Sequence, residues 1–191
     1  MDKTEIIEKL RLYNTGEIDD LEKLGNEIIK RSRKEVEDII RIWVEDEEGL
    51  MEDASELLNE LGDIAIIPLL EAGPDLIEIQ RANLILMTGN AQIEVRKKIV
   101  TSIVPLLEDK EKIPYEISLD NVEEEPPIRR VCDEAYLQLR RLLNTTESEE
   151  SYLINKSIYL HLDFNERDKE IADTKASGKW DRWFNESDEE E

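Results

Sequence analysis

The side chains that carry most enzyme chemistry are scarce in this sequence. Its 191 residues include one histidine and one cysteine, His161 and Cys132. Nucleophilic catalysis needs a base beside a serine or cysteine, and most zinc sites need several His or Cys ligands. His161 lies in an apolar run, which favours a surface or interfacial histidine, and Cys132 follows the helical stripe of Val131 and Leu139. We therefore expect Cys132 to lie in the core, and we expect no enzymatic activity and no cofactor.

The sequence contains no loop motif that would hold a phosphate or a calcium ion. Its seven glycines are dispersed, without the close spacing that nucleotide-binding loops require. No stretch places acids at alternate positions around a central glycine, as an EF-hand loop does. Pairs of carboxylates carry little information here, because 48 acidic residues outnumber 25 basic ones. The sequence thus predicts no dedicated metal site.

Two acidic clusters are informative because of where they fall. Residues 45–56 hold seven acids and no Lys or Arg, at the turn between two expected helices. Three further glutamates lie in a long connection, residues 109–126. Like-charged ridges can steer and orient a basic partner, although a solvated surface that keeps the protein soluble is an equally open interpretation. The acids predicted to contact a partner are Asp46, Glu47, Glu48, Asp53, Glu123, Glu124 and Glu125.

Aromatic residues near the C-terminal end give a second indication of binding. Trp180 and Trp183 follow shortly after Gly178. Tryptophan is enriched where the energy of protein binding concentrates, so we include both residues in the predicted partner-binding set. Their position favours a structural role in which they fold back and seal the last helix pair, and both interpretations stay open.

The spacing of apolar residues predicts helices almost throughout. Apolar side chains recur at intervals of three and four rather than in strict alternation, which is typical of helices with one buried face. Gly73-Pro74 predicts a helix start with proline in the first turn, and Gly89-Asn90 predicts its end. The expected helices span residues 35–45, 50–61, 63–72, 73–87, 92–108 and 127–143.

The two ends of the chain fit this periodicity less well. Residues 3–13 and 17–30 are expected to form two amphipathic helices. Residues 158–164 alternate as a strand would, but their context favours a helix, and another helix is expected over residues 165–176. Residues 186–191 are predicted to be a disordered acidic tail.

Residues 61–143 resemble HEAT repeats, especially the short bacterial type also found in phycobilin lyases. The matching pieces include Leu61-Gly62, Ala65-Ile66-Ile67-Pro68, Gly73-Pro74-Asp75, Val95-Arg96 and Pro127-Ile128-Arg129. The resemblance implies an all-α fold, an α-solenoid of stacked antiparallel helix pairs with atypical capping helices at both ends. The long connection at 109–126 and both terminal regions depart from the repeat pattern. We therefore predict one HEAT-like domain over residues 1–185, with an N-terminal cap at 1–34, repeats at 35–143 and a C-terminal cap at 144–185.

Charge and hydropathy narrow the expected partners and location. A formal net charge of -23 repels nucleic acid and anionic lipid, since binding to either usually requires clustered Lys and Arg. No hydrophobic leader follows Met1, and the longest uncharged run, residues 82–93, is shorter than the roughly 20 residues of a membrane helix. We expect a cytoplasmic protein with neutral or basic protein partners, bound to neither nucleic acid nor membrane.

The function expected from these observations is that of a non-enzymatic protein-binding module. In this interpretation an acidic HEAT-like solenoid docks a basic protein, and in a sharper version it is an immunity or inhibitor protein that neutralises a cationic toxin such as a nuclease. The resemblance leaves alternatives open: a bilin lyase-like or other HEAT-like enzyme acting on a small molecule, or a scaffold or assembly factor. HEAT-like DNA glycosylases are disfavoured, because they need a basic groove.

Overall fold

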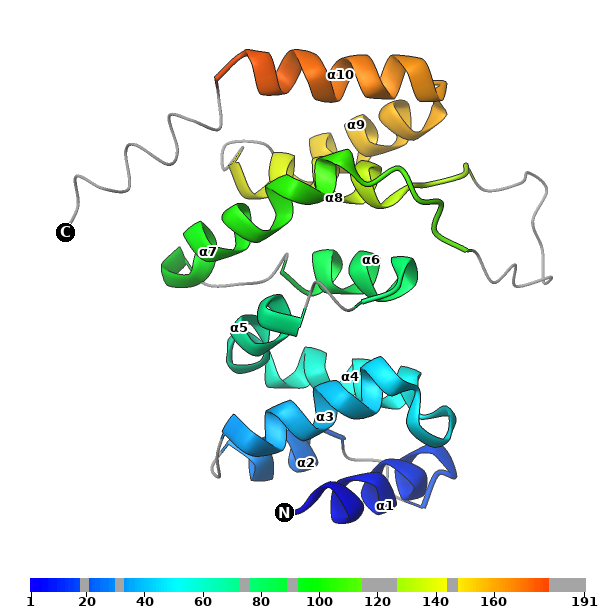
Figure 1. The fold of residues 1–191 in the computed structure, drawn as a ribbon, viewed down its shortest axis with the longest axis vertical. Helices are drawn as coiled ribbons and strands as arrows, with labels where there is room; N and C mark the ends of the chain where they lie inside the picture. Colours follow the sequence, from blue (N-terminus) through cyan, green and yellow to red (C-terminus); the bar gives the residue numbers. More distant parts are fainter. Residues whose placement is uncertain are drawn as a thin grey trace. The chain divides into compact units, whose positions relative to one another are not determined.

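A computed structural model shows the fold of the chain (Figure 1). The residues that it describes are 1–17, 21–29, 33–72, 76–88, 93–114, 127–143 and 148–178. Every regular element within these ranges is a helix, and the pairing of Lys112 with Arg130 adds one isolated antiparallel bridge. The expected all-α class is therefore confirmed. The chain divides into two compact units, unit 1 over residues 1–95 and unit 2 over residues 96–191.

Unit 1 follows the predicted helices closely over most of its length. The structure confirms helices near residues 35–45, 50–61 and 63–72, with bounds that differ by two residues or fewer. The described elements of unit 1 are α1 (Lys3–Asn14), α2 (Leu21–Ile29), α3 (Arg33–Glu45), the 3-10 turn η1 (Glu47–Gly49), α4 (Met51–Leu61), α5 (Asp63–Ala72) and α6 (Glu78–Met87).

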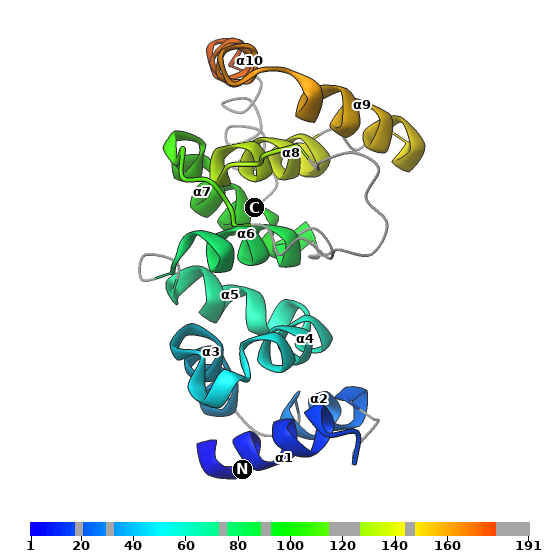
Figure 2. The ribbon, with the colours of Figure 1, turned by 90° about the vertical axis from the view of Figure 1, so that its right-hand side faces the viewer.

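The helices of unit 1 pack in an order that follows the sequence. α3 and α4 form the central pair, with α1 and α2 on one side and α5 on the other, and α6 packs against α5 (Figure 2). Their apolar stripes meet in one core, in which Trp43 is fully buried as its regular stripe predicts. Ile39 and Leu57, from the two central helices, are also 0 % exposed. Apart from the α3–α4 pair, much of this packing joins each helix to the second helix along the chain, as in α1 with α3, α2 with α4 and α3 with α5.

Gly73 and Pro74, where a helix was predicted to start, lie outside the described residues. Of the described residues that follow, Leu76 and Ile77 are not helical, and α6 begins at Glu78. Leu76 precedes the helix and is buried, and its carbonyl accepts a hydrogen bond from Arg81 at 2.5 Å. The Gln80 side chain caps the start by accepting from the Ile77 backbone N–H at 3.2 Å. With Leu76 buried in front of it, α6 begins later than the local proline signal predicts.

Unit 2 has shorter helices than the periodicity predicts. The expected helix over 92–108 ends at residue 103 and continues as a 3-10 turn, where Pro105 supplies no N–H for an α-helical bond. Residues 158–161 belong to a helix, so the prediction of a helix rather than a strand in this region is confirmed. The described elements are α7 (Ile93–Ile103), which begins at the unit boundary, the 3-10 turn η4 (Val104–Glu108), α8 (Val131–Leu143), α9 (Glu149–His161) and α10 (Phe164–Ala176).

The helix expected over residues 127–143 begins only at Val131. Residues 127–130 lie before the helix instead, and Arg130 pairs with Lys112 in the antiparallel bridge. The Ile113 N–H donates to the Arg129 carbonyl, and the Val131 N–H donates to the Glu111 carbonyl, each at 3.0 Å. Backbone groups at the expected start of the helix are thus used in pairing with an earlier segment of the same chain.

None of the helices in the described ranges combines the length and the apolar composition that crossing a bilayer requires.

Candidate functional site

The most distinctive surface of unit 1 is a row of glutamates along α4. Glu52, Glu56 and Glu60 are spaced four residues apart and are all exposed. Residues at this spacing lie on one face of a helix, so their carboxylates repel one another. α4 carries no Lys or Arg that would compensate them. We call these three residues the acidic face of unit 1.

The turn before α4 holds three of the predicted partner-binding residues, Asp46, Glu47 and Glu48. Asp46 adopts a left-handed backbone with φ 47°, and its Oδ1 accepts from the Met51 N–H at 3.2 Å. Glu47 forms an ion pair with Lys3 of α1, which also lies 3.3 Å from Glu45. These contacts raise the pKa of Lys3, chiefly through its hydrogen bond to Glu47. The turn is therefore held in place by its own acids, and Asp46 remains exposed.

The other predicted acids of this cluster lie in different settings. Asp53 is buried, and its Oδ2 accepts from the Asn14 side chain at 3.0 Å, which joins α4 to the end of α1. Glu48 lies in η1. The adjacent Tyr13 hydroxyl donates to Glu56 at 3.0 Å, and this hydrogen bond, with the nearby negative charge, raises the Tyr13 pKa. Asp53 thus supports the helix packing beneath the acidic face.

The remaining predicted contacts lie outside the described residues. These are Glu123, Glu124 and Glu125 in the long connection and Trp180 and Trp183 near the C-terminal end.

The prediction did not include the acidic face as such. Its signal is present in the sequence, since glutamates at positions i, i+4 and i+8 occur on a helix without any basic residue.

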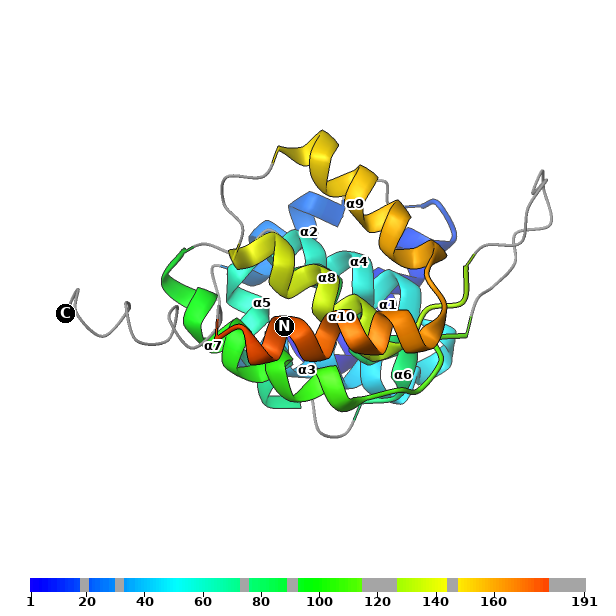
Figure 3. The ribbon, with the colours of Figure 1, turned by 90° about the horizontal axis from the view of Figure 1, so that it is seen from above.

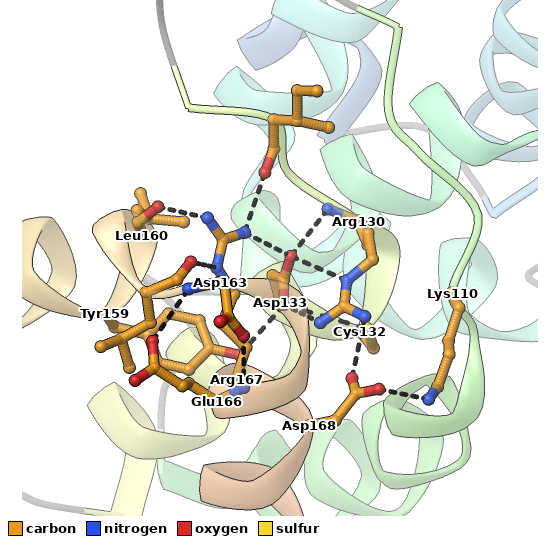
Figure 4. A network of polar contacts seen from close by, with 12 residues as sticks. Lys110, Arg130, Cys132, Asp133, Tyr159, Leu160, Asp163, Glu166, Arg167 and Asp168 are labelled. Carbon is orange, nitrogen blue, oxygen red and sulfur yellow. Dashed lines mark hydrogen bonds and ion pairs between the residues drawn. The ribbon is translucent and has the colours of Figure 1, made fainter.

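Unit 2 contains a buried carboxylate that joins three segments of the chain (Figure 4). Asp133 of α8 is 0 % exposed. Its Oδ1 accepts from Arg130 at 2.8 Å and from the Tyr159 hydroxyl at 3.0 Å. Its Oδ2 accepts from the Arg130 backbone N–H at 3.0 Å and from Arg167 at 2.9 Å. The carboxylate therefore receives donors from the segment before α8, from α9 and from α10.

The Arg167 guanidinium extends this network to backbone carbonyls. It is 3 % exposed and donates to Leu162 at 3.0 Å, to Ile128 at 2.8 Å and to Leu160. These carbonyls belong to the end of α9 and to the extended segment before α8. Arg167 also lies over the Phe164 ring, 5.3 Å from its centroid. Asp163 and Glu166 cap the start of α10, each accepting a backbone N–H of the other (Figure 4).

This arrangement is structural rather than catalytic. Each oxygen of Asp133 is already saturated with donors, so neither is available as a general base. Burial, and after it the charge of Asp133, raises the pKa of the Cys132 thiol from 9.0 to about 11, which keeps it protonated near neutral pH. The same two causes raise the pKa of Tyr159. Cys132 is 0 % exposed, as the sequence predicts, and it is not an activated nucleophile.

The network also holds both ends of the long connection. Arg130 donates to Asp168 at 2.8 Å, and Lys110 donates to the other oxygen of Asp168 at 2.5 Å. Lys110 is the second residue of the connection, and Arg130 follows its end. These bonds lower the pKa of Asp168, chiefly through Lys110. Together with the pairing of Lys112 and Arg130, they join the two described segments that flank residues 115–126.

A groove of about 470 Å³ lies between η4 and α10. Leu107, Ile171 and Ala172 contribute apolar surface to it. Its lysines are paired with carboxylates, Lys110 with Asp168 and Lys175 with Glu108. The groove therefore offers no unpaired lysine to an anionic ligand.

Among the described residues no group of three or more His, Cys, Asp or Glu side chains is placed to hold a metal ion.

Comparisons with protein families, with characterised proteins and with solved structures find no match for this chain.

Proposed function

We propose that this protein is a non-enzymatic binding module that docks a basic protein surface through unit 1. The observation that carries the proposal is the acidic face, Glu52, Glu56 and Glu60, exposed on a helix without any Lys or Arg. Like charges at this spacing cost a helix about 0.2–0.5 kcal/mol per pair, and a basic partner would relieve that repulsion. Binding would thus convert an unfavourable local charge arrangement into a favourable one.

The charge of the whole chain supports the same partner class. A net charge of -23 attracts a cationic protein over distances of about a Debye length, roughly 8 Å at physiological salt. Such attraction raises the rate of association and fixes orientation more than it raises affinity. Exposed Asp46 lies in the turn just before the acidic face, so it would extend the charged surface.

The scaffold that we propose for this surface is a HEAT-like α-solenoid. Its support is the layered packing within unit 1, where α1 and α2 pack against the α3–α4 pair, and α5 packs against that pair and against α6. Such a scaffold presents turns and insertions along its sides. In this proposal Glu47 and Glu48 contribute from the turn before α4, Asp53 contributes from within α4, and Glu123, Glu124 and Glu125 form a second contact. Trp180 and Trp183 would be apolar anchors.

A sharper form of the proposal is an inhibitor of a cationic toxin, such as a nuclease. A row of carboxylates would occupy the positions of successive phosphates in the active site of such an enzyme. This form predicts competition between the protein and nucleic acid for one basic surface.

The test begins with affinity capture of basic proteins at low salt, followed by identification and purification of the retained protein. Its dissociation constant is then measured for the wild type and for two triple variants by isothermal titration calorimetry. The face variant is Glu52→Gln, Glu56→Gln and Glu60→Gln. The control variant is Glu5→Gln, Glu8→Gln and Glu17→Gln, which changes exposed acids of unit 1 by the same total charge.

We expect the face variant to weaken binding about tenfold or more, and the control variant to weaken it about threefold or less. Binding by the wild type should also weaken as salt increases. Equal losses in the two variants would show that only net charge matters and would contradict the assignment of the acidic face. If a nuclease is captured, inhibition of its activity by the wild type tests the sharper form.

A further inference from the structure

α9 carries an exposed apolar surface that the proposed function does not use. Leu153, Ile154 and Ile158 are 55 %, 54 % and 59 % exposed. The opposite side of the helix is buried through Tyr152 and Tyr159. Other large exposed apolar residues of the described chain, such as Ile64 and Leu86, occur singly on their helices. Clustered exposed apolar side chains usually mark an interaction surface, whereas scattered ones do not.

The residues on the exposed side of α9 are spaced symmetrically about the middle of the helix. Glu150, Ile154, Ser157 and His161 lie along its centre, all exposed, at intervals of four, three and four residues. Leu153 and Ile158 flank this line at equal distances from its midpoint, between Asn155 and Lys156. Within unit 2, α9 packs against α8 (Figure 3), and the side chains of this side are exposed. We call these six residues the α9 face.

A symmetric pair of chains needs a surface that complements itself. We propose that the α9 face binds the α9 face of a second copy of this chain, with the two helices antiparallel. Antiparallel pairing about the midpoint sets Ile154 beside Ile158 of the second copy and covers the apolar centre of both helices. It also sets Glu150 opposite His161 of the second copy, at both ends of the contact. Parallel pairing would instead set Glu150 against Glu150.

The geometry of His161 suits this contact. Its Nδ1 lies 2.7 Å from the Ser157 carbonyl of the same helix, which fixes the ring and leaves Nε2 for a group outside the helix. In the antiparallel pair that group is the Glu150 carboxylate of the second copy. A histidine paired with a carboxylate at each end fixes the register of two otherwise apolar surfaces.

The size and the charge of the chain set the strength of the dimer. One helix face buries less than the roughly 1,200–2,000 Å² of a standard stable interface, so the dimer should be weak and dependent on concentration. Each copy carries a net charge of -23, and salt screens the repulsion between copies. Dimerisation should therefore strengthen as salt increases. Binding of a basic protein through the acidic face should weaken under the same change, so the two proposals succeed or fail separately.

The test is sedimentation equilibrium of the full chain over protein concentrations from about 1 to 500 μM, at low and at high salt. We expect the average mass of the wild type to rise toward twice the monomer mass at high concentration, and to rise further at high salt. Ile158→Glu should stay monomeric throughout. Ile64→Glu, the same substitution at an exposed isoleucine of unit 1, should associate as the wild type does.

Charge exchange tests the antiparallel register. Glu150→Lys and His161→Glu should each weaken the dimer, and the double variant should restore it, because each changed residue meets the other across the symmetry axis. Circular dichroism verifies that every variant is folded. Failure of the double variant to recover would overturn the antiparallel register.

A wild type that stays monomeric at every concentration and salt would overturn the dimer itself. If Ile158→Glu also lowers the melting temperature of that monomer, the face is covered within its own chain.

Discussion

The Asp133 carboxylate of α8 and the Arg167 guanidinium of α10 lie 2.9 Å apart, with side chains that are 0 % and 3 % exposed. They are separated by 34 residues in the sequence. Two guanidiniums, Arg130 and Arg167, share this one carboxylate, and Arg130 also reaches Asp168. The pairing of buried charges is worth little by itself, but the loss of one partner leaves the others without compensation. Unit 2 is therefore expected to depend strongly on Asp133.

Asp133→Asn should destabilise the protein by about 3–5 kcal/mol, because it removes the negative charge between two buried guanidiniums while preserving side-chain shape. Urea unfolding followed by circular dichroism measures the loss. The matched control is Asp173→Asn on α10, where the side chain is exposed, and it should change stability by less than about 0.5 kcal/mol. Similar losses for the two variants would mean that the network carries no special share of the stability.

Two glycines of unit 1 should respond to alanine in opposite directions. Gly62 follows α4 with φ 55° and ψ -131°, a conformation that side chains with a Cβ rarely adopt, so Gly62→Ala should destabilise by about 1–3 kcal/mol. Gly25 lies inside α2, and a Cβ there would make ordinary contacts, 3.5 Å from the Cβ of Glu60 and 3.9 Å from Leu57. Gly25→Ala should stabilise by about 0.5–1 kcal/mol. Thermal melting of both variants measures the difference, and a shared sign would contradict the backbone assignment at Gly62.

The sequence predicts the helices well where the burial pattern is local. Trp43 and Cys132 follow regular stripes, and both are buried as expected. The prediction fails at residues 76–77 and at residues 127–130, where distant contacts override local signals. Leu76 is buried in the core before α6 begins. Arg130 pairs with Lys112, which lies near the start of the long connection. Nothing in a local window indicates either contact.

The acidic face and the buried Asp133 network also differ in how far the sequence alone predicts them. The acidic cluster is visible as composition, yet its exposed row on α4 requires the helix spacing of Glu52, Glu56 and Glu60 to be considered. The Asp133 network was not predicted, because its partner Arg167 lies on another helix far along the chain. An aspartate within an apolar helical stripe, three residues after an arginine, was the available signal. It indicates a buried charge, but it does not identify the second arginine.

Alkaline pH should destabilise the protein through the buried groups of unit 2. An unfolded Cys132 ionises near its ordinary pKa of 9.0, while the folded thiol keeps its proton up to about 11. Because the unfolded state then binds fewer protons, stability is complete below pH 9 and is lost as the pH rises toward 11. Each such proton contributes about 1.4 kcal/mol per pH unit to the slope. The raised pKa of Tyr159 acts in the same direction above its ordinary value of 10.0.

Urea midpoints measured between pH 7 and 11 check this expectation. Cys132→Ala should flatten the decline between pH 9 and 11, whatever its effect on stability at pH 7. A wild-type midpoint that stays constant to pH 11 would exclude a protonated buried thiol in the folded state.

Removing the charges of the acidic face should stabilise the unbound protein. The triple variant Glu52→Gln, Glu56→Gln and Glu60→Gln removes two like-charge pairs along α4, each costing about 0.2–0.5 kcal/mol. The hydrogen bond from Tyr13 survives, because a glutamine oxygen still accepts at position 56. Glu5→Gln is the contrast, since Glu5 lies in the first turn of α1, where a negative charge favours the helix by about 0.3–1 kcal/mol. We therefore expect the melting temperature to rise in the triple variant and to fall for Glu5→Gln. A fall in both would mean that the glutamates of α4 stabilise the fold, and the argument that a bound cation relieves their repulsion would be lost.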